Sequence, residues 1–159
     1  AGKSTFAELL SQVYDCNVFH MDHFFLPQAQ KTAARLSEPG GNVHYERFFD
    51  EVILGLESRR PFQYGVFDCS IQSISKMVDV NPKRLNIVEG SYSLHPHLEK
   101  AYDLNILLRV EPELQRARIL ERSGEKLLTR FVEEWIPLEN RYFSELNIAD
   151  RAHMILDIS

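Results

Sequence analysis

The sequence predicts a three-layer α/β/α fold with a mainly parallel β-sheet. Segments with apolar residues at helical spacing alternate along the chain with short apolar runs. Two of these runs, 85–88 and 104–110, are short and β-prone, as buried parallel strands are. Because 159 residues suit one compact unit and no internal repeat is visible, we expect residues 1–159 to form a single domain.

The first half of the chain is expected to alternate between helices and strands around one long loop. Apolar residues at spacings of three and four predict a helix over 4–13, which opens directly on Gly2-Lys3-Ser4. The other elements expected here are a strand at 17–21 that ends in Asp22, a loop with one short helix at 26–43, a helix at 45–56, a strand at 62–69 and then a polar stretch.

The second half repeats the alternation. The elements expected here are the strand at 85–88 that ends in Glu89-Gly90, the strand at 104–110, a helix at 112–122, helical spacing over 128–146 and a last strand at 153–158. Pro137 is expected to kink or restart the second helical segment. A short lid is expected near 111–126, where Ser123-Gly124-Glu125 interrupts the helical pattern.

Composition and charge argue against several classes of protein. The net charge of −5 provides no basic field for a polyanion, so we expect no nucleic-acid partner. The two cysteines, Cys16 and Cys69, match neither a zinc finger nor a disulfide scaffold. No apolar run approaches the ~18 residues of a membrane span, and no leader pattern opens the sequence. We therefore expect a soluble, cytoplasmic protein without a membrane partner.

The first residues resemble the end of a phosphate-binding loop. Gly2-Lys3-Ser4 supplies the last three positions of G-x-x-x-x-G-K-[ST], so we expect a buried strand and the first glycine to precede Ala1. In such a loop Gly2 lets the backbone approach phosphate, Lys3 reaches the β- and γ-phosphates, and the Ser4 hydroxyl binds Mg²⁺. We assign Gly2, Lys3, Ser4 and Thr5 to nucleotide binding; the alternative is an ordinary helix entry.

Two acidic residues follow predicted strands. Ligands of parallel sheets bind at the carboxyl ends of the strands, which favours Asp22 as a catalytic base or as a Mg²⁺ ligand through water. Glu89 leaves a buried strand, where a carboxylate is costly unless it is used, and we expect it in the shell of the metal ion. The alternatives are a turn or helix-capping role for Asp22 and a capping or ion-pairing role for Glu89.

Three arginines precede the expected lid hinge. Arg116, Arg118 and Arg122 are candidates for supplying positive charge to a bound triphosphate, and we assign Arg118 and Arg122 to catalysis beside Lys3. A solvated helix face is the alternative. Structural zinc is not expected at His20, Asp22 and His23, because His23 points to the opposite side of a strand from the other two.

Taken together, these segments resemble the uridine-kinase group of P-loop kinases, which also includes nicotinamide riboside kinase and phosphoribulokinase. The resemblance rests on the loop end at 1–5, on His20-Met21-Asp22-His23-Phe24-Phe25, on Val66-Phe67-Asp68, on Ile87-Val88-Glu89-Gly90, on 131–137 and on 152–156. It implies a P-loop NTPase fold, ATP and Mg²⁺ as cofactors, and Asp22 as the base.

The same resemblance points to an acceptor-binding side of the site. His44 stands where uridine kinases carry an Asp that holds the sugar hydroxyls, Phe67 replaces a Tyr, and Gln72 falls near a base-contacting His. With Tyr45 and Asp68, these residues form our candidate acceptor-binding set. The departures leave the nucleoside pocket open to another ribosyl or hydroxylated metabolite.

The sequence therefore predicts a kinase that transfers the γ-phosphoryl group to a hydroxyl of a nucleoside or similar metabolite. Nicotinamide riboside, pantothenate or a sugar is an alternative acceptor, as is shikimate or gluconate for another P-loop branch. A GTP-dependent switch or regulatory ATPase is the alternative from a different class, although no Asn-Lys-x-Asp segment is present. The sequence leaves homo-oligomerisation open.

Overall fold

The computed structural model describes residues 2–159, so Ala1 of the loop motif lies outside the described residues. The chain forms two compact units, one of residues 4–101 and one that joins the N-terminal residues up to Lys3 with residues 102–159. Both units mix helices and strands. The single domain expected from the sequence stays a prediction.

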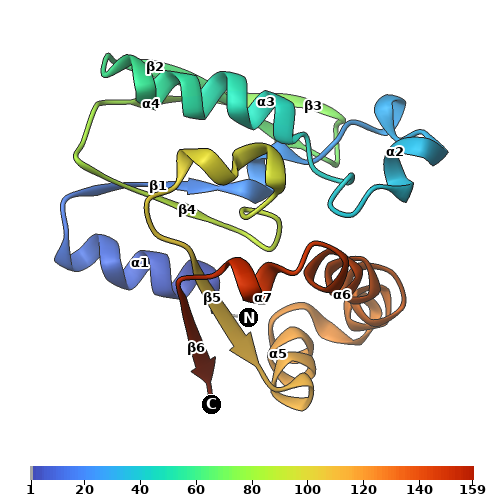
Figure 1. The fold of residues 1–159 in the computed structure, drawn as a ribbon. Coiled ribbons are helices and arrows are strands. Elements are labelled where there is room, and N and C mark those ends of the chain that lie inside the picture. The colour runs from blue at the N-terminus through green and yellow to red at the C-terminus, as the bar shows by residue number, and fades with distance from the viewer. Residues whose placement is uncertain (1) are drawn as a thin grey trace. The chain divides into compact units, whose positions relative to one another are not determined.

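A parallel strand pair lies at the centre of the unit of residues 4–101. Strand β1 (Cys16–His20) pairs with β4 (Leu85–Glu89), and His20 stands opposite Glu89 in the register. Figure 1 shows the two strands side by side. Helix α1 (Lys3–Val13) precedes β1, as the apolar spacing predicts. Both strands thus end at the same edge, where Glu89 is the last residue of β4 and Asp22 lies two residues after β1.

The segment after β1 turns immediately. A 3₁₀ turn, η1 (Met21–Phe24), follows His20, so Asp22 lies in a turn two residues beyond the strand. The long loop contains a second 3₁₀ turn, η2 (Gln28–Gln30), and the short helix α2 (Ala33–Ser37). Its two ends meet at an isolated bridge between Phe25 and Val43.

A helix and a hairpin follow the loop. Helix α3 (Tyr45–Phe48), the π-helical η3 (Phe49–Ile53) and α4 (Leu54–Ser58) run consecutively, and η3 contacts strand β2 (Phe62–Asp68). Strand β3 (Ser73–Val80) pairs antiparallel with β2. The polar stretch expected after residue 69 contains this strand, which the sequence did not indicate. Six of the eight β3 residues are exposed, so its polar side chains face solvent while the backbone pairs with β2.

Aromatic packing fills the core of this unit. The fully buried side chains include Phe19, Phe24 and Phe48, and the rings of Phe24 and Phe48 meet edge to face at 4.8 Å. The 3₁₀ segment η4 (Pro96–Ala101), which the sequence did not indicate, adds the buried Leu98. The turn that carries Asp22 contributes Met21 and Phe24 to this core.

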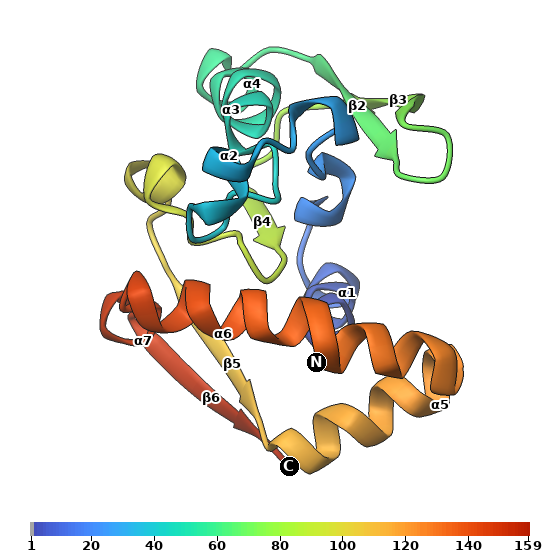
Figure 2. The same cartoon turned by 90° about the vertical axis from the view of Figure 1, so that its right-hand side faces the viewer.

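The second unit holds another parallel pair and the C-terminal helices. Strand β5 (Ile106–Val110) pairs with β6 (Met154–Ile158). The helical elements between them are α5 (Pro112–Arg130), the π-helical η5 (Phe131–Trp135), α6 (Ile136–Glu145) and α7 (Ile148–Arg151). Gly124 has non-helical angles inside α5, and Figure 2 shows the chain turning within α5 before it continues into α6.

Most of the expected elements are present. The strand pairs β1–β4 and β5–β6 are parallel, as expected, whereas β2–β3 is antiparallel. Helix α6 begins at Ile136 with Pro137 in its first turn, where the missing N–H costs little, so a helix restarts beside Pro137 as expected. The three-layer arrangement stays a prediction. Among residues 2–159, no helix combines the length and apolar character needed to cross a bilayer.

Candidate active site

The centre of the candidate site is a hydrogen-bonded group around the Glu89 carboxylate. Ser4 Oγ, in the first turn of α1, donates to Glu89 Oε1 over 3.2 Å. The same oxygen lies 2.5 Å from Nδ1 of His20 on the neighbouring strand. Glu89 is only 8% exposed, and two polar partners offset part of the cost of burying its carboxylate. The structure thus joins two of the residues expected to hold the metal ion.

Backbone packing brings Asp22 to the same edge. Gly90, directly after Glu89, has φ 147°, and a Cβ at this position would overlap the Cβ of Met21. Only glycine allows this approach without strain. Met21 and Gly90 therefore touch where β1 and β4 end, and each is the chain neighbour of one candidate acid. Asp22 itself is exposed, so its carboxylate faces solvent at this edge.

The oxygen atoms at this edge fit a magnesium ion. Mg²⁺ prefers hard oxygen ligands and is commonly bound by one or two carboxylates together with substrate phosphates. Ser4 and Glu89 supply a hydroxyl and a carboxylate in direct contact. Among residues 2–159, no group of three or more His, Cys, Asp or Glu side chains is arranged to hold a metal ion. This donor set suits an ion that reaches the site together with a triphosphate.

A second group of side chains lies beside the Asp22 turn. The rings of His20 and His23 are 5.2 Å apart, and His23 Nδ1 lies 3.3 Å from the Tyr64 hydroxyl. Burial, followed by the positive charges of His20 and Lys76, lowers the pKa of His23. This face of the turn is therefore aromatic and holds a histidine that favours its neutral form.

Arg47 fixes the backbone of this turn from behind. Its guanidinium donates to the carbonyl oxygens of His23 (2.7 Å) and Gly65 (2.8 Å), and it pairs with Glu51 at 3.0 Å. Burial lowers the pKa of Arg47 even though Glu51 opposes that shift. A guanidinium of this kind stays charged, so Arg47 ties helix α3 to the residue that follows Asp22.

His44 lies near the same turn through the backbone. Its N–H donates to the carbonyl oxygen of Phe24 over 2.6 Å. The imidazole is half-buried, and burial lowers its pKa. The structure thus brings the residue expected to replace the sugar-binding Asp close to the turn that carries Asp22.

The loop after β2 also adjoins the Asp22 region. Burial, followed by the negative charges of Asp68 and Asp22, raises the pKa of the Cys69 thiol, although Lys31 opposes this. Asp68 accepts hydrogen bonds from the backbone and hydroxyl of Ser70, and these bonds lower the pKa of Asp68.

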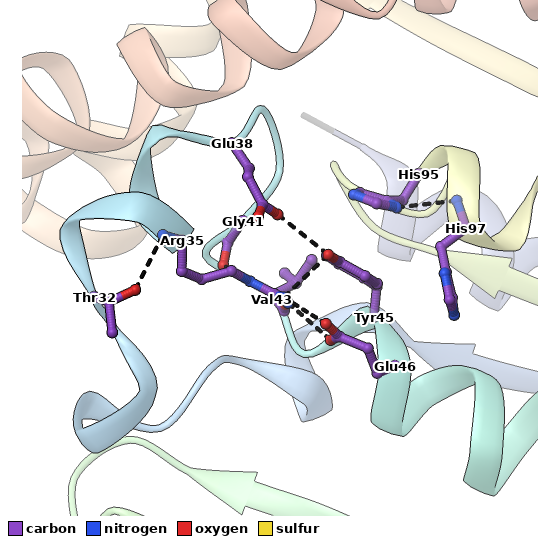
Figure 3. Close-up of polar contacts among 9 residues, drawn as sticks. All are labelled: Thr32, Arg35, Glu38, Gly41, Val43, Tyr45, Glu46, His95 and His97. Carbon is purple, nitrogen blue, oxygen red and sulfur yellow. Dashed lines mark hydrogen bonds and ion pairs between the residues drawn. The ribbon is translucent and has the colours of Figure 1, made fainter.

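Three of the candidate acceptor-binding residues are already engaged within the chain. Gln72 accepts from the Gln28 N–H (2.8 Å) and donates to the Cys69 carbonyl (2.8 Å), so its amide pins two loops together. Phe67 is 7% exposed and belongs to the core. Tyr45 lies between Arg35 and His95, as Figure 3 shows. Ligand contacts by these three stay predictions.

The unit that contains Gly2 and Lys3 supplies the arginines. A Cβ on Gly2 would lie 4.0 Å from Nη1 of Arg118, so this guanidinium flanks the loop end. Arg122 instead donates to Ser123 and lies 5.8 Å from the ring centre of Phe131. Arg116 and the Thr5 side chain of the other unit are exposed. The structure thus brings Arg118 to Gly2, whereas a role for Arg122 stays a prediction.

The same unit has an open hollow of about 410 Å³ where β5 and β6 end, lined in part by Arg109, Glu111 and Asp157. Arg109 and Asp157 form an ion pair across the strands, at 2.8 Å from Nε to Oδ1. The carboxyl ends of parallel strands are where ligands bind in such sheets, so the hollow has the expected position for part of a ligand.

Sequence reasoning missed His20, Arg47 and Tyr64 as parts of the site. The signal for His20 is its position just before Asp22 at the end of a predicted strand. The strand face expected for His20 and Asp22 is wrong, because β1 ends at His20 and the His20 and His23 rings lie 5.2 Å apart. Arg47 carried no signal, since its role depends on the carbonyl oxygens of residues distant in sequence.

Comparison with known proteins gives a result at the level of fold. No family model matches the sequence, and no curated protein matches it significantly. One similar solved structure, from Bacillus stearothermophilus, is described as a "possible uridine kinase"; it aligns with 98% of this chain and 82% of its own, at a TM-score of 0.73 and 19% identity. Another, from a Silicibacter species, is described as a "putative fructose transport system kinase"; it aligns with 97% of this chain and 83% of its own, at a TM-score of 0.57 and 22% identity.

This chain has the fold of these kinases. The resemblance inferred from the sequence is thereby confirmed at the level of the fold. At these identities the likeness concerns the fold, and the acceptor of each neighbour is a property of that neighbour.

Proposed function

We propose that this chain is a phosphotransferase that moves the γ-phosphoryl group of ATP to a hydroxyl group of a nucleoside or similar small metabolite. The observation that carries the proposal is the contact between Ser4 and Glu89 at the edge where β1 and β4 end. A hydroxyl from a phosphate-loop helix and a carboxylate from a strand end are the groups that hold a nucleotide-bound Mg²⁺. The kinase fold supports the same interpretation.

Each residue then has a proposed role in phosphate binding. Gly2, Lys3, Ser4 and Thr5 bind the phosphates through the backbone amides, the Lys3 ammonium and the hydroxyls. Ser4 and Glu89 directly, and Asp22 through water, would hold Mg²⁺, which would neutralise charge on the β- and γ-phosphates. Arg118 and, more remotely, Arg122 supply further positive charge as negative charge builds up on the leaving group.

Asp22 is the proposed general base. The acceptor oxygen forms its new bond to the γ-phosphorus, the bond from that phosphorus to the ADP oxygen breaks, and the hydroxyl proton passes to the Asp22 carboxylate. Exposure of Asp22 at the strand edge supports this role, because an acceptor must be able to reach it. His44, Tyr45, Phe67, Asp68 and Gln72 remain the proposed acceptor-binding side. The single three-layer domain is part of the same proposal.

The test is ADP release by the intact protein with MgATP and a panel of acceptors: uridine, nicotinamide riboside, pantothenate and fructose. We expect one acceptor to stimulate release strongly. We expect Asp22→Asn to lower turnover by about 10²–10⁴-fold, the range for loss of a general base, with nucleotide affinity changed less than about threefold. Retained turnover would exclude Asp22 as the base, and ADP release that ignores every acceptor would favour a regulatory ATPase.

A further inference from the structure

The loop of residues 27–42 is closed on itself in a way that the proposed chemistry does not require. Its ends meet at the Phe25–Val43 bridge, and the Leu26 N–H donates to the Asn42 carbonyl over 3.0 Å. The loop leaves the turn that carries Asp22 and returns directly to His44. The conformation of the loop therefore affects the position of His44, the first residue of the proposed acceptor-binding set.

One side chain in the middle of this loop binds its return end. Arg35, in α2, donates through Nε to the Gly41 carbonyl (2.9 Å) and through Nη2 to the Val43 carbonyl (3.0 Å). Figure 3 shows this guanidinium at the centre of the network. The loop cannot open at residue 43 without breaking these bonds.

The same guanidinium is anchored to helix α3. Its two terminal nitrogens form a paired ion contact with the Glu46 carboxylate, one bond at 2.8 Å, and Nη1 also donates to the Tyr45 hydroxyl at 3.0 Å. The Arg35 side chain is only 16% exposed. The hydrogen bonds from Arg35 lower the pKa of Glu46, so this carboxylate is charged at neutral pH. A planar guanidinium fits this fork of acceptors, which a lysine ammonium cannot match.

A ring stack continues the network toward the segment after Glu89. The guanidinium lies 4.1 Å from the centre of the Tyr45 ring, and the His95 imidazole stacks on that ring at 3.9 Å and 15°. His95 is buried and lies six residues beyond Glu89. The segments that follow the two acid-bearing strands are thus joined through Tyr45.

We propose that Arg35 is a positioning residue of the acceptor site: it latches the loop of residues 27–42 onto α3 and so holds His44 beside the Asp22 turn. This inference rests on the proposed function. Arg35 makes its contacts within the loop, to α3 and to the Tyr45 ring, so its effect on the acceptor passes through His44 and Tyr45.

The test compares Arg35→Gln and Arg35→Lys with Arg130→Gln, a control at an exposed arginine that pairs with Glu134 four residues away. With the acceptor that the panel identifies, we expect Arg35→Gln to raise the acceptor KM about tenfold or more, with kcat and the affinity for a fluorescent ATP analogue within about twofold. Arg35→Lys keeps the charge facing Glu46, and its acceptor KM should lie between those of Arg35→Gln and the unsubstituted protein. The control should match the unsubstituted protein.

Limited proteolysis gives a reading that does not depend on activity. Thr32 is exposed in the latched loop, and we expect a lysine-specific protease to cleave the Lys31–Thr32 bond at least about tenfold faster in Arg35→Gln. An unchanged acceptor KM in Arg35→Gln would overturn the positioning role. A rise in the acceptor KM together with an equal loss of nucleotide affinity would also overturn it. Unchanged cleavage would overturn the latch. Absence of turnover with every acceptor would instead refute the proposed function, and the cleavage rate would still decide whether the latch exists.

Discussion

At the scale of single residues, the site depends on one oxygen shared by two partners. Ser4 and His20 both contact Oε1 of Glu89, and the carboxylate is buried between them. A residue so placed contributes through its charge and its orientation, and an isosteric amide removes only the charge.

We therefore expect Glu89→Gln to lower the contribution of Mg²⁺ to nucleotide binding about 10- to 100-fold. Binding of the same nucleotide in EDTA should stay within about twofold. Titration of a fluorescent ATP analogue with and without Mg²⁺ measures both. Glu57→Gln, at an exposed position of α4, is the control. Equal Mg²⁺ dependence in Glu89→Gln and the control would argue against Glu89 in the metal shell.

Gly90 is a second residue whose identity is set by a neighbour. We expect Gly90→Ala to lower the free energy of unfolding by about 1–3 kcal/mol, because its φ of 147° is strained for alanine and its Cβ would overlap Met21. Denaturant titration measures this change. Turnover should also fall in the folded variant, since Met21 must shift beside Asp22. Unchanged stability would mean that the two strand ends separate easily.

At the scale of elements, the bend in α5 is the feature most open to a simple test. Gly124 has φ 76° and ψ 171°, a region that essentially only glycine occupies, and no atom within 4 Å would meet an added Cβ. An alanine at this position would therefore be strained by its backbone angles and not by a clash of its Cβ.

Gly124→Ala should straighten α5, with helix content rising in far-UV circular dichroism and stability changing by about 1 kcal/mol or less. If the expected lid near 111–126 must bend over the triphosphate, kcat should fall several-fold while the acceptor KM stays constant. Ala117→Gly, in the same helix, provides the opposite change in propensity. Unchanged kcat in a straightened helix would exclude the bend from the catalytic cycle.

At the scale of the whole molecule, the Arg35–Glu46 pair links stability to pH. The hydrogen bond from Arg35 lowers the pKa of Glu46 from 4.5 to about 2. A carboxyl whose pKa falls on folding stabilises the protein above its unfolded value, and this contribution is lost as pH falls through the folded value.

We therefore expect the gap in unfolding free energy between the unsubstituted protein and Glu46→Gln to be largest above about pH 5 and to shrink between pH 4.5 and 2. Chemical denaturation across this range measures the gap. A gap that is constant with pH would show that the ion pair contributes nothing beyond a neutral hydrogen bond.

The sequence by itself determined most elements of the fold and the edge at which the acids lie. Apolar spacing located α1, β1, β4, β5 and β6, and strand-end logic singled out Asp22 and Glu89. These signals are local, because periodicity and the residue after a strand can be read without knowing any neighbour. The sequence pattern did not predict the hairpin strand β3, because its side chains are mostly exposed and its stability comes from pairing with β2.

Only the tertiary structure decided which side chains meet. The contact of Ser4 with Glu89 spans 85 residues, the bond of Gln72 to Gln28 spans 44, and the sandwich of Tyr45 between Arg35 and His95 joins three separate segments. Such contacts depend on strand register and loop closure, and these are set by packing of the whole unit. The sequence could therefore predict the candidate reacting residues. The residues that position them could be identified only from the tertiary contacts.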